Sequence, residues 1–596
     1  MGANDFTLQI ATVNGSGSQT ANTVLMRSLF QMGIPVTGKN LFPSNIAGLP
    51  TWFTIRASKH GWVGRKKEID FLVAMNPESA REDVMGLEAG SAVVYDEPLK
   101  LDGLRADLHF YPVPFDKLVG PVCPEPKLRK LVRNMIYDGV LAQLVGIELE
   151  EIRKALAKQF GPRKAKAAEL NWGAVEAGFD FAVKNLAKTD TCRVERMDAT
   201  RGKIIIDGNA ACALGAVFAG ATVVTWYPIT PSTSLVESMA GYLKRLRIDK
   251  QTGKATFAVV QAEDELAAIG MAIGAGWAGA RSMTATSGPG ISLMSEFTGL
   301  GYYIEAPAVI FDVQRVGPST GLPTRTAQGD ILTTAVLSHG DTKHPLLLPS
   351  SPVECFTMAQ DAFNLAEEFQ TPVFVMTDLD LGMNNWMSEP FPYPSEPIRR
   401  GKVLTAADLD RLGGFARYKD VDGDGVGYRT LPGTDHAAAG FFTRGSGHDE
   451  KARYSERPED YIHNVDRLAR KFESIRGRVP LPEVVRNDNA SIGLICYGTT
   501  RYAVEESRDQ LQRDFGLETS YLRLKAYPFT SQLKDFLERH ARVYLVEQNR
   551  DGQMLALMRM DLEPGDAAKL RSVRYYGGLP IDARTVTDEI ARQEGL

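Results

Sequence analysis

Three carboxylates stand together at the start of a segment rich in alanine and glycine. Glu263, Asp264 and Glu265 precede the run Leu266–Gly279, which contains four glycines. A carboxylate held out of water can move protons as a general acid or base. Carboxylates at the beginning of a helix also interact favourably with its dipole, and this structural role is the alternative for any one of the three. Glycine costs up to about 1 kcal/mol per helix position relative to alanine, so the four glycines indicate tight packing or close approach of a ligand.

A strand-like segment with two prolines precedes these carboxylates. In Thr222–Ser234 the apolar residues run into Pro228 and Pro231, which restrict the backbone on either side of Ile229 and Thr230. Such a turn at a strand end can present the Thr230 hydroxyl and nearby amides to an anionic ligand. The alternative is a plain strand-to-helix turn, in which one of the hydroxyl residues after Pro231 caps the next helix.

Two further glycine-containing loops carry groups that could hold a planar cofactor or an anion. Met283–Met294 predicts a strand, a Gly-Pro-Gly turn at Ser287 and Gly288, and a helix, and the backbone of such a turn can approach a cofactor closely. Arg315 and Arg325 lie on a loop rich in glycine and proline after a buried strand, where guanidinium groups can form paired hydrogen bonds with carboxylates. A surface salt bridge is the alternative for each arginine.

Buried strands that alternate with helical segments must position these groups. The alternation predicts a mostly parallel sheet, and in such a sheet ligands bind at the carboxyl ends of the strands. Several of the loops described above fall at such ends. The expected strands are 222–226, 257–260, 282–286, 309–313 and 373–376.

The whole chain is expected to be an α/β protein with three α/β domains. The first covers residues 1–188, where a strand, the turn 14–18 and a helix are followed later by a mostly helical tail. A polar linker leads into the second domain at 199–384. Residues 385–488 have weak periodicity and are expected to form an inserted arm or linker, and 489–596 form a third, small domain.

Three motifs, in this order, resemble one known family nearly letter for letter. Tyr-Pro-Ile-Thr-Pro-Ser at 227–232, Thr-Ser-Gly-Pro-Gly at 286–290 and Gly-Leu-Pro-Thr-Arg at 321–325 resemble the alpha subunit of 2-oxoacid:ferredoxin oxidoreductases. These thiamine-dependent enzymes exchange 2-oxoacid plus coenzyme A for acyl-CoA and carbon dioxide. The resemblance extends from the first domain to about residue 560. It implies a gamma-type first domain fused ahead of a pyrimidine-type thiamine diphosphate domain, with a transketolase C-terminal-like domain at the end.

The same resemblance assigns roles around the cofactor. It makes Glu265 the catalytic glutamate that hydrogen-bonds the aminopyrimidine of thiamine diphosphate, with Glu263 and Asp264 as alternatives. A carboxylate in a dry site stabilises the imino tautomer, which can remove the thiazolium C2 proton and create the carbanion that attacks the substrate ketone. Ser287 and Gly288 are then expected to contact the cofactor.

Three residues are implied to bind the substrate. By resemblance Thr230 contacts the 2-oxoacid carboxylate, and Arg315 and Arg325 bind or position substrate carboxylates. A dicarboxylate such as 2-oxoglutarate would give both arginines a role, and so would a monocarboxylate together with coenzyme A phosphates. We expect 2-oxoglutarate, the substrate of the family members that the arm also resembles, with pyruvate or a branched-chain 2-oxoacid as the alternative.

A beta-type partner subunit is expected to complete the site. The five cysteines lie at least 20 residues apart, without the short spacings of clusters and zinc sites, so the iron–sulfur cluster is expected in the partner. The Mg²⁺ that accompanies thiamine diphosphate is expected to be shared with that partner. Ferredoxin is the implied electron carrier, and the family implies a heterotetramer of two alpha and two beta chains.

One aspartate-rich stretch imitates two metal motifs. Gly423-Asp424-Gly425 looks like the start of a diphosphate–magnesium motif, but charged residues precede it where a buried strand is expected. Asp420, Asp422 and Asp424 resemble the start of a calcium loop, although Leu431 stands where the bidentate glutamate belongs. We therefore assign no metal ligand to this chain, and the alternative to a metal site is a simple Asp/Gly turn. His344, His436 and His448 fit no catalytic or metal pattern and are expected to be structural or solvated.

Composition excludes several other classes of protein. The 596 residues carry a formal net charge of -5, which gives no footprint for nucleic acid or a membrane surface. No apolar run is long enough to span a bilayer, and the amino-terminal residues show no leader pattern, so a cytoplasmic enzyme is expected. The rival hypothesis is a non-catalytic acyl-CoA or nucleotide-binding protein that uses the turn at Gly15 and Gly17.

Overall fold

The computed structural model describes residues 3–43 and 48–596, and the chain divides into two compact units. Met1 and Gly2 of the amino-terminal segment considered above lie outside the described residues. The first unit comprises Met1–Ile206, Asn384–Pro390 and Asp582–Arg584, and the second comprises Asp207–Met383, Phe391–Ile581 and Thr585–Leu596. Among the described residues, no helix combines the length and the apolar character needed to cross a membrane.

A six-stranded sheet forms the centre of the first unit, in the order β2-β3-β1-β4-β5-β6. The strands β1, β4, β5 and β6 run parallel, as buried strands in an α/β domain do, while β3 pairs antiparallel with both β1 and β2. The sequence did not predict this antiparallel pair. The bounds are β1 (Asp5–Val13), β2 (Val36–Leu41), β3 (Pro50–Ser58), β4 (Phe71–Ala74), β5 (Ala92–Asp96) and β6 (His109–Val113).

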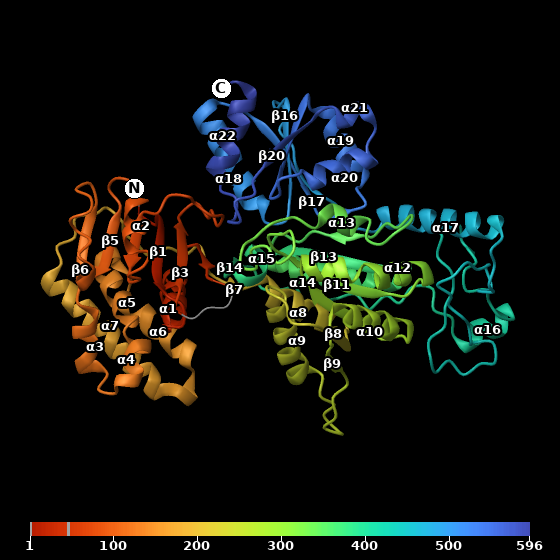
Figure 1. Ribbon diagram of the computed structural model, residues 1–596, viewed down its shortest axis with the longest axis horizontal. Helices are drawn as coiled ribbons and strands as arrows, with labels where there is room; N and C mark the ends of the chain where they lie inside the picture. The colour runs from red at the N-terminus through yellow and green to blue at the C-terminus, as the bar shows by residue number, and fades with distance from the viewer. Residues whose placement is uncertain (1–2, 44–47) are drawn as a thin grey trace. The chain divides into compact units, whose positions relative to one another are not determined.

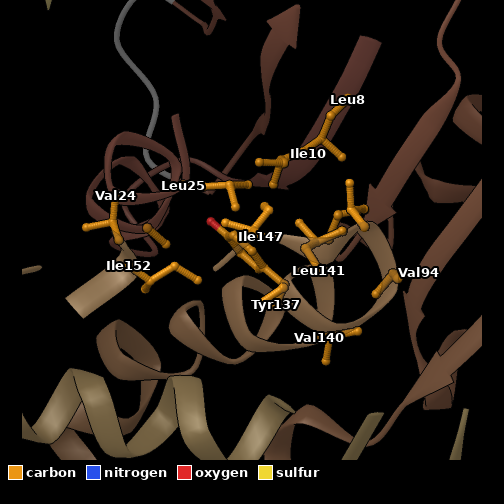
Figure 2. Packing of buried hydrophobic residues seen from close by; sticks show 14 of the residues in the cluster. Leu8, Ile10, Val24, Leu25, Val94, Tyr137, Val140, Leu141, Ile147 and Ile152 are labelled. Carbon is orange, nitrogen blue, oxygen red and sulfur yellow. The ribbon is translucent and has the colours of Figure 1, made fainter. Parts of the chain in front are cut away.

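Helices pack against this sheet and build the core of the first unit. Side chains of β1, α1 and α5 meet there, with Tyr137 among the aliphatic residues (Figure 2). The expected helical tail is present, and a Cβ at Gly139 would lie 1.9 Å from the carbonyl oxygen of Val175, so glycine lets α5 approach α7 closely. The helices are α1 (Ser18–Gln31), α2 (Ala80–Met85), α3 (Phe115–Val122), α4 (Pro126–Val132), α5 (Met135–Leu141), α6 (Leu149–Phe160) and α7 (Ala165–Asn185).

The turn at residues 14–18 is held from within the first unit. Gly15 and Gly17 both have positive φ, which glycine adopts without cost, and Asn134 donates a 2.8 Å hydrogen bond to the carbonyl of Ser16. Beyond the polar linker, β7 (Ile204–Ile206) pairs with β14 (Trp386–Ser388), so the chain returns to the first unit after β13 (Pro372–Asp378) of the second unit.

A seven-stranded sheet forms the centre of the second unit, in the order β18-β12-β13-β11-β10-β8-β9. All its strands are parallel except β18, so the predicted mostly parallel sheet is confirmed, as are its five predicted strands. The bounds are β8 (Val223–Trp226), β9 (Ala258–Gln261), β10 (Ser282–Thr286), β11 (Ala308–Gln314), β12 (Leu346–Leu347), β13 (Pro372–Asp378) and β18 (Ala526–Tyr527).

A five-stranded sheet, β15-β17-β16-β19-β20, lies near the carboxyl terminus of the same unit. Figure 1 shows α18 and α22 on one face of it, and α19, α20 and α21 on the other. The strands are β15 (Glu483–Val485), β16 (Ile492–Tyr497), β17 (Thr519–Leu524), β19 (Arg542–Glu547) and β20 (Leu570–Arg574). The helices are α18 (Thr500–Phe515), α19 (Ser531–Arg539), α20 (Gln553–Asp561), α21 (Pro564–Ala567) and α22 (Ala583–Glu594).

The segment with weak periodicity before this sheet is an ordered arm that docks on the central sheet domain. It contains α16 (Ala406–Leu412) and α17 (Pro458–Arg476). From α17, Arg467 and Lys471 place their cationic groups 2.6 and 2.8 Å from the carboxylate of Glu305, and all three side chains are buried. Burial raises the pKa of Glu305, but the two cations outweigh it and hold that pKa well below the usual value. The arm is therefore fixed by a buried charge cluster.

Candidate active site

The three neighbouring carboxylates have different positions in the structure. Glu265 is the first residue of α10 (Glu265–Trp277) and is buried, with 7% of its surface exposed. Asp264 caps this helix, because its side chain accepts a 2.7 Å hydrogen bond from the backbone N–H of Ala267. Glu263 points into solvent. The dipole and capping interpretation therefore accounts for Asp264, and Glu265 is the carboxylate held out of water.

The Gly-Pro-Gly turn lies directly against Glu265. The turn opens the short helix α11 (Gly288–Leu293) at the carboxyl end of β10. A Cβ on Gly290 would lie 1.9 Å from Oγ1 of Thr286 and 2.9 Å from Cγ of Glu265, so only glycine fits there. The Ser287 hydroxyl is fully buried and finds no hydrogen-bond partner among the described residues. An unpaired buried hydroxyl costs free energy, so it is a ready contact for a bound cofactor.

Hydrogen bonds fix β8 and the turn that follows it. The β8 residue Thr225 donates a 2.7 Å hydrogen bond to the carbonyl of Ala268, which fixes α10 against this strand. Asn209 donates a 2.9 Å hydrogen bond to the carbonyl of Pro231. Ser232 occupies the N-cap position of α9 (Thr233–Leu246), but its hydroxyl donates to the carbonyl of Ile229 instead of accepting from the helix. The predicted side-chain cap of this helix is therefore not formed.

Arg315 reaches from the end of β11 to this turn. One guanidinium nitrogen, Nη1, donates a 2.6 Å hydrogen bond to the carbonyl of Thr230, while Nε is buried without a partner in the described part of the chain. Burial lowers the pKa of Arg315, and the carboxylates of Asp330 and Glu265 oppose that effect. Among the described residues no carboxylate lies within 4 Å of the guanidinium. A buried cation with an unused donor is suited to receive an anion.

Arg325 has different surroundings. Its Nη1 donates 3.0 Å hydrogen bonds to the carbonyl and the hydroxyl of Thr324, its own neighbour in the chain. Its stem packs against Gly578, where an added Cβ would lie 3.1 Å away. The contacts described above thus bring Glu265, Thr230 and Arg315 together with the Gly-Pro-Gly turn, and they do not include Arg325.

A cavity of about 920 Å³ opens beside Arg315 and Gly288. The start of α11 and the loop after β11 line it together with residues 548–553 before and within α20. Gln328 ties these parts together, because its backbone N–H donates to the carbonyl of Gln548 at 2.8 Å and its Oε1 accepts from the N–H of Gln548 at 3.0 Å. The sequence did not single out Gln328 or Gln548, since neither belongs to a local motif.

Two buried carboxyls near Arg315 were also missed. Asp312 lies within β11 and is fully buried, and Asp330 lines the cavity just before α13 (Ile331–Ala335). Burial and the neighbouring charge of Asp330 raise the pKa of Asp312 well above its usual value. An aspartate in the middle of the apolar run Val309–Val313 was the one signal in the sequence that could have found this pair.

The aspartate-rich stretch in the arm forms ion pairs with a lysine and an arginine. The Lys402 ammonium lies 2.7 Å from a carboxylate oxygen of Asp422 and 2.7 Å from one of Asp424, and Arg470 lies 3.3 Å from Asp420. Protein cations thus contact all three aspartates. Across the described residues, no group of three or more His, Cys, Asp or Glu side chains is arranged to hold a metal ion.

Two of the three histidines considered above are packed inside the protein. His344 lies between the rings of Tyr302 and Phe374, and burial lowers its pKa to about 4, so it is neutral at physiological pH. His448 packs on Tyr418. The expectation of a structural role is confirmed for both.

Comparison with known proteins agrees with this fold. The family model "Pyruvate flavodoxin/ferredoxin oxidoreductase, thiamine diP-bdg" matches residues 214–394, and the model "Pyruvate ferredoxin/flavodoxin oxidoreductase" matches residues 7–181. The chain is 31% identical over 611 residues to 2-oxoacid:ferredoxin oxidoreductase 2, subunit alpha, of Aeropyrum pernix, with 93% of each chain covered. It is 37% identical over 356 residues to the 2-oxoglutarate synthase subunit KorA of Methanothermobacter thermautotrophicus, covering 59% of this chain and 88% of that protein.

A solved structure resembles the whole chain. It is the 2-oxoglutarate:ferredoxin oxidoreductase from Magnetococcus marinus with 2-oxoglutarate, coenzyme A and succinyl-CoA bound, which matches with a TM-score of 0.88 and 28% identity over 99% of this chain and 100% of that one. The mostly parallel sheet and the thiamine diphosphate-binding family model over residues 214–394 place the chain in the class of α/β oxidoreductase subunits. The chain belongs to the 2-oxoacid:ferredoxin oxidoreductase family, in which it corresponds to the alpha subunit.

Proposed function

We propose that the chain supplies the pyrimidine side of a thiamine diphosphate site that oxidises a 2-oxoacid, with coenzyme A as acyl acceptor and ferredoxin as electron carrier. The observation that carries the proposal is Arg315, a buried arginine that bonds the turn at Thr230 and keeps a donor unused beside Glu265. The proposed substrate is 2-oxoglutarate. The names of the relatives from Methanothermobacter and Magnetococcus support that choice.

The chain's own residues fit the cofactor. When bound, thiamine diphosphate supplies a carbanion that adds to the ketone of the substrate. Glu265 would accept a hydrogen bond from the aminopyrimidine and hold the proton that must leave and return there. The unpaired Ser287 hydroxyl would contact the ring system, and the backbone at Gly288 would lie against it. Burial of Glu265 keeps water from competing for its carboxylate.

The substrate carboxylate would meet Arg315 and the Thr230 hydroxyl. A guanidinium presents donors in a planar fork, so an anion can take up the Nε donor that is unused in the structure. Thr230 is partly exposed at the same place, and its carbonyl fixes the other side of the guanidinium. Arg325 is assigned a weaker role, because its Nη1 donates hydrogen bonds to Thr324, its own neighbour in the chain.

A beta-type subunit is proposed to complete the site. Large apolar side chains stay exposed on α10, α11 and the following helix α12 (Ser295–Ile304). Such a patch on a soluble protein marks a contact surface for another protein. The apolar patch consists of Leu266, Met271, Trp277, Leu293 and Phe297. The partner would carry the Mg²⁺–diphosphate site and the iron–sulfur cluster, in a complex of two alpha and two beta chains.

The domain roles follow from the same proposal. Residues 1–188 are assigned as the gamma-type domain, 199–384 as the pyrimidine-type domain, 385–488 as the inserted arm and 489–596 as the transketolase C-terminal-like domain. The family models that match 7–181 and 214–394 support the first two assignments.

The test of the catalytic role is Glu265→Gln in the complex with the beta subunit, with the exposed Glu263→Gln as matched control. Loss of a general acid–base group lowers the rate by about 10²–10⁴-fold, so we expect dye reduction with 2-oxoglutarate to fall by that factor in Glu265→Gln alone. Equal activity of both variants would contradict the assignment.

The test of the substrate site compares Arg315→Lys with Arg325→Lys. Hydrogen bonds to charged groups contribute about 1.5–3 kcal/mol, so we expect KM for the 2-oxoacid to rise roughly 10- to 100-fold in the first variant and much less in the second. Measuring KM for 2-oxoglutarate, pyruvate and a branched-chain 2-oxoacid on the same preparations identifies the substrate.

A further inference from the structure

Asp312 and Asp330 place two carboxyl groups together beside the proposed substrate site. Asp312 and Gln314 are two residues apart in β11, so their side chains lie on the same face of the strand. The side chain of Gln314 accepts a 3.1 Å hydrogen bond from the backbone N–H of Asp330, which brings Asp330 to that face. In the described part of the chain, no amide, hydroxyl or amine donates to either oxygen of Asp312 or to Oδ2 of Asp330.

A carboxyl pair with no other donors is stable when it shares a proton. The pKa of Asp312 is raised by burial, by the charge of Asp330 and by a hydrogen bond between the two carboxyls. Burial also raises the pKa of Asp330, although its hydrogen bond with Asp312 and the charge of Arg315 oppose the increase. One proton therefore belongs to the pair as a whole, and the pKa of each carboxyl is raised above the ordinary aspartate value.

Charged groups reach the pair from several elements. Arg315 follows the same strand, and the charges of Asp330 and Glu265 both act on its guanidinium. On the neighbouring strand β13, the buried Asp378 pairs in register with Gln314 and accepts a 2.5 Å hydrogen bond from the Thr499 hydroxyl. Toward the cavity, Arg550 and Asp551 form their own ion pair at 2.7 Å in the loop before α20. The first residue of α20, Gln553, is neutral, and α11 approaches Asp330 only through Gly288, where a Cβ would lie 2.9 Å from Oδ1.

We propose that the pair formed by Asp312 and Asp330 takes up one proton from solvent when a substrate carboxylate binds to Arg315. The proposal rests on the proposed function, because it needs an anion at Arg315. Binding brings a new negative charge close to Asp330, and it also draws the guanidinium toward the substrate. Both effects favour protonation of Asp330, which then becomes a neutral carboxylic acid while the buffer loses one proton.

This proton uptake has a consequence for specificity. The added proton offsets the charge of the carboxylate that binds to Arg315, so this carboxylate enters without repulsion from Asp330. A neutral or amidated analogue brings no charge and triggers no uptake. By linkage, the dissociation constant of the anion rises with pH by up to tenfold per unit wherever one proton is taken up. Asp330 is thus a positioning residue that acts through Arg315.

The test uses the assembled complex and oxalate, an unreactive carboxylate probe. Calorimetric titrations in phosphate and in Tris at pH 7 give the number of protons taken up, and repeats from pH 5.5 to 8.5 give the dissociation constant. We expect uptake of up to one proton per site in the natural complex and none in Asp330→Asn. Asp551→Asn removes a carboxylate from the same cavity and should keep the uptake.

Three possible results distinguish failure of the carboxyl-pair proposal from failure of the proposed substrate site. A heat of binding that does not depend on the buffer in the natural complex would overturn the carboxyl-pair proposal, and this result needs no variant. Proton uptake that persists in Asp330→Asn would overturn the carboxyl-pair proposal as well. If Asp330→Asn fails to assemble, Asp312→Asn replaces it in the test. The amide of Asp312→Asn always donates a hydrogen bond to Asp330, so the pH dependence of oxalate binding should move to lower pH. If Arg315→Gln binds oxalate as tightly as the natural complex, the proposed substrate site is wrong, whatever the proton count.

Discussion

Gly290→Ala should misplace Glu265 while leaving the sheet intact. The alanine Cβ would lie 1.9 Å from Thr286 Oγ1 and 2.9 Å from Glu265 Cγ, whereas ordinary contacts begin at 3.4 Å. The hydroxyl must retreat by about 1.5 Å and the glutamate stem by about 0.5 Å. Thr286 is fully buried, so its side chain has little room to move, and Glu265 is expected to take up part of the strain.

Two magnitudes follow from this overpacking. Extra methyl groups in a packed region cost about 1–3 kcal/mol of stability, and displacement of a catalytic group by about 1 Å costs about 10²-fold in rate. We expect kcat for 2-oxoacid-dependent dye reduction to fall about 10- to 100-fold in the reconstituted complex. The apparent melting temperature should decrease by only a few degrees.

Gly241→Ala is the matched control. Gly241 lies on an exposed position of α9, and a Cβ there would meet nothing within 4 Å. Alanine should stabilise that helix by up to about 1 kcal/mol without change in kcat. If Gly290→Ala folds and turns over at the natural rate, the argument that glycine is needed to seat Glu265 is wrong.

Two further predictions concern buried charges. Glu305→Gln leaves Arg467 and Lys471 buried without a counter-charge, which costs about 3–5 kcal/mol, so hydrogen exchange in α17 should accelerate about 10²–10⁴-fold; unchanged exchange would contradict the role of this cluster. Burial raises the pKa of Glu354, but hydrogen bonds and charge from Arg523 outweigh it and hold the pKa at about 2. Stability on the order of 3 kcal/mol is therefore present above pH 4.5 and lost as the pH falls toward 2, and Glu354→Gln should flatten acid unfolding in that range.

The central sheet could be predicted because its strands carry a local signal. Buried parallel strands are short apolar runs between helices, and the run at 282–286 coincides with β10. The helix ends were harder to predict. At α9 the hydroxyl residues favoured a side-chain cap, but Ser232 bonds backward to Ile229, since the two prolines already shape the turn.

An arm at 385–488 was expected, but its docking could not be predicted, because the stabilising contacts come from distant residues. In the sequence, Arg467 and Lys471 look like solvent-facing charges of a helix. They are buried because both bond Glu305, which lies more than 160 positions earlier in the chain. The pair formed by Asp312 and Asp330 was not predicted, for the same reason. Asp312 and Asp330 are separated by a loop, and nothing in their spacing indicates that Gln314 draws them together.

The sequence indicated both arginines of the candidate site but could not rank them. Resemblance pointed to Arg315 and Arg325 alike, because both stand in one glycine- and proline-rich loop. The structure separates their surroundings, since Arg315 reaches the turn at Thr230 and Arg325 bonds within its own segment. Distances between groups on different loops are a property of the folded sheet, so sequence spacing could not rank the two.

If the proposed beta subunit covers the apolar patch, the supply of that subunit sets a condition on how a cell makes this protein. A chain synthesised in excess of the proposed subunit would expose Leu266, Met271 and Phe297 to water, where apolar surfaces associate with one another. Matched production of the two subunits would then be a solubility requirement, and overproduction of this chain alone should yield aggregates that the second subunit prevents.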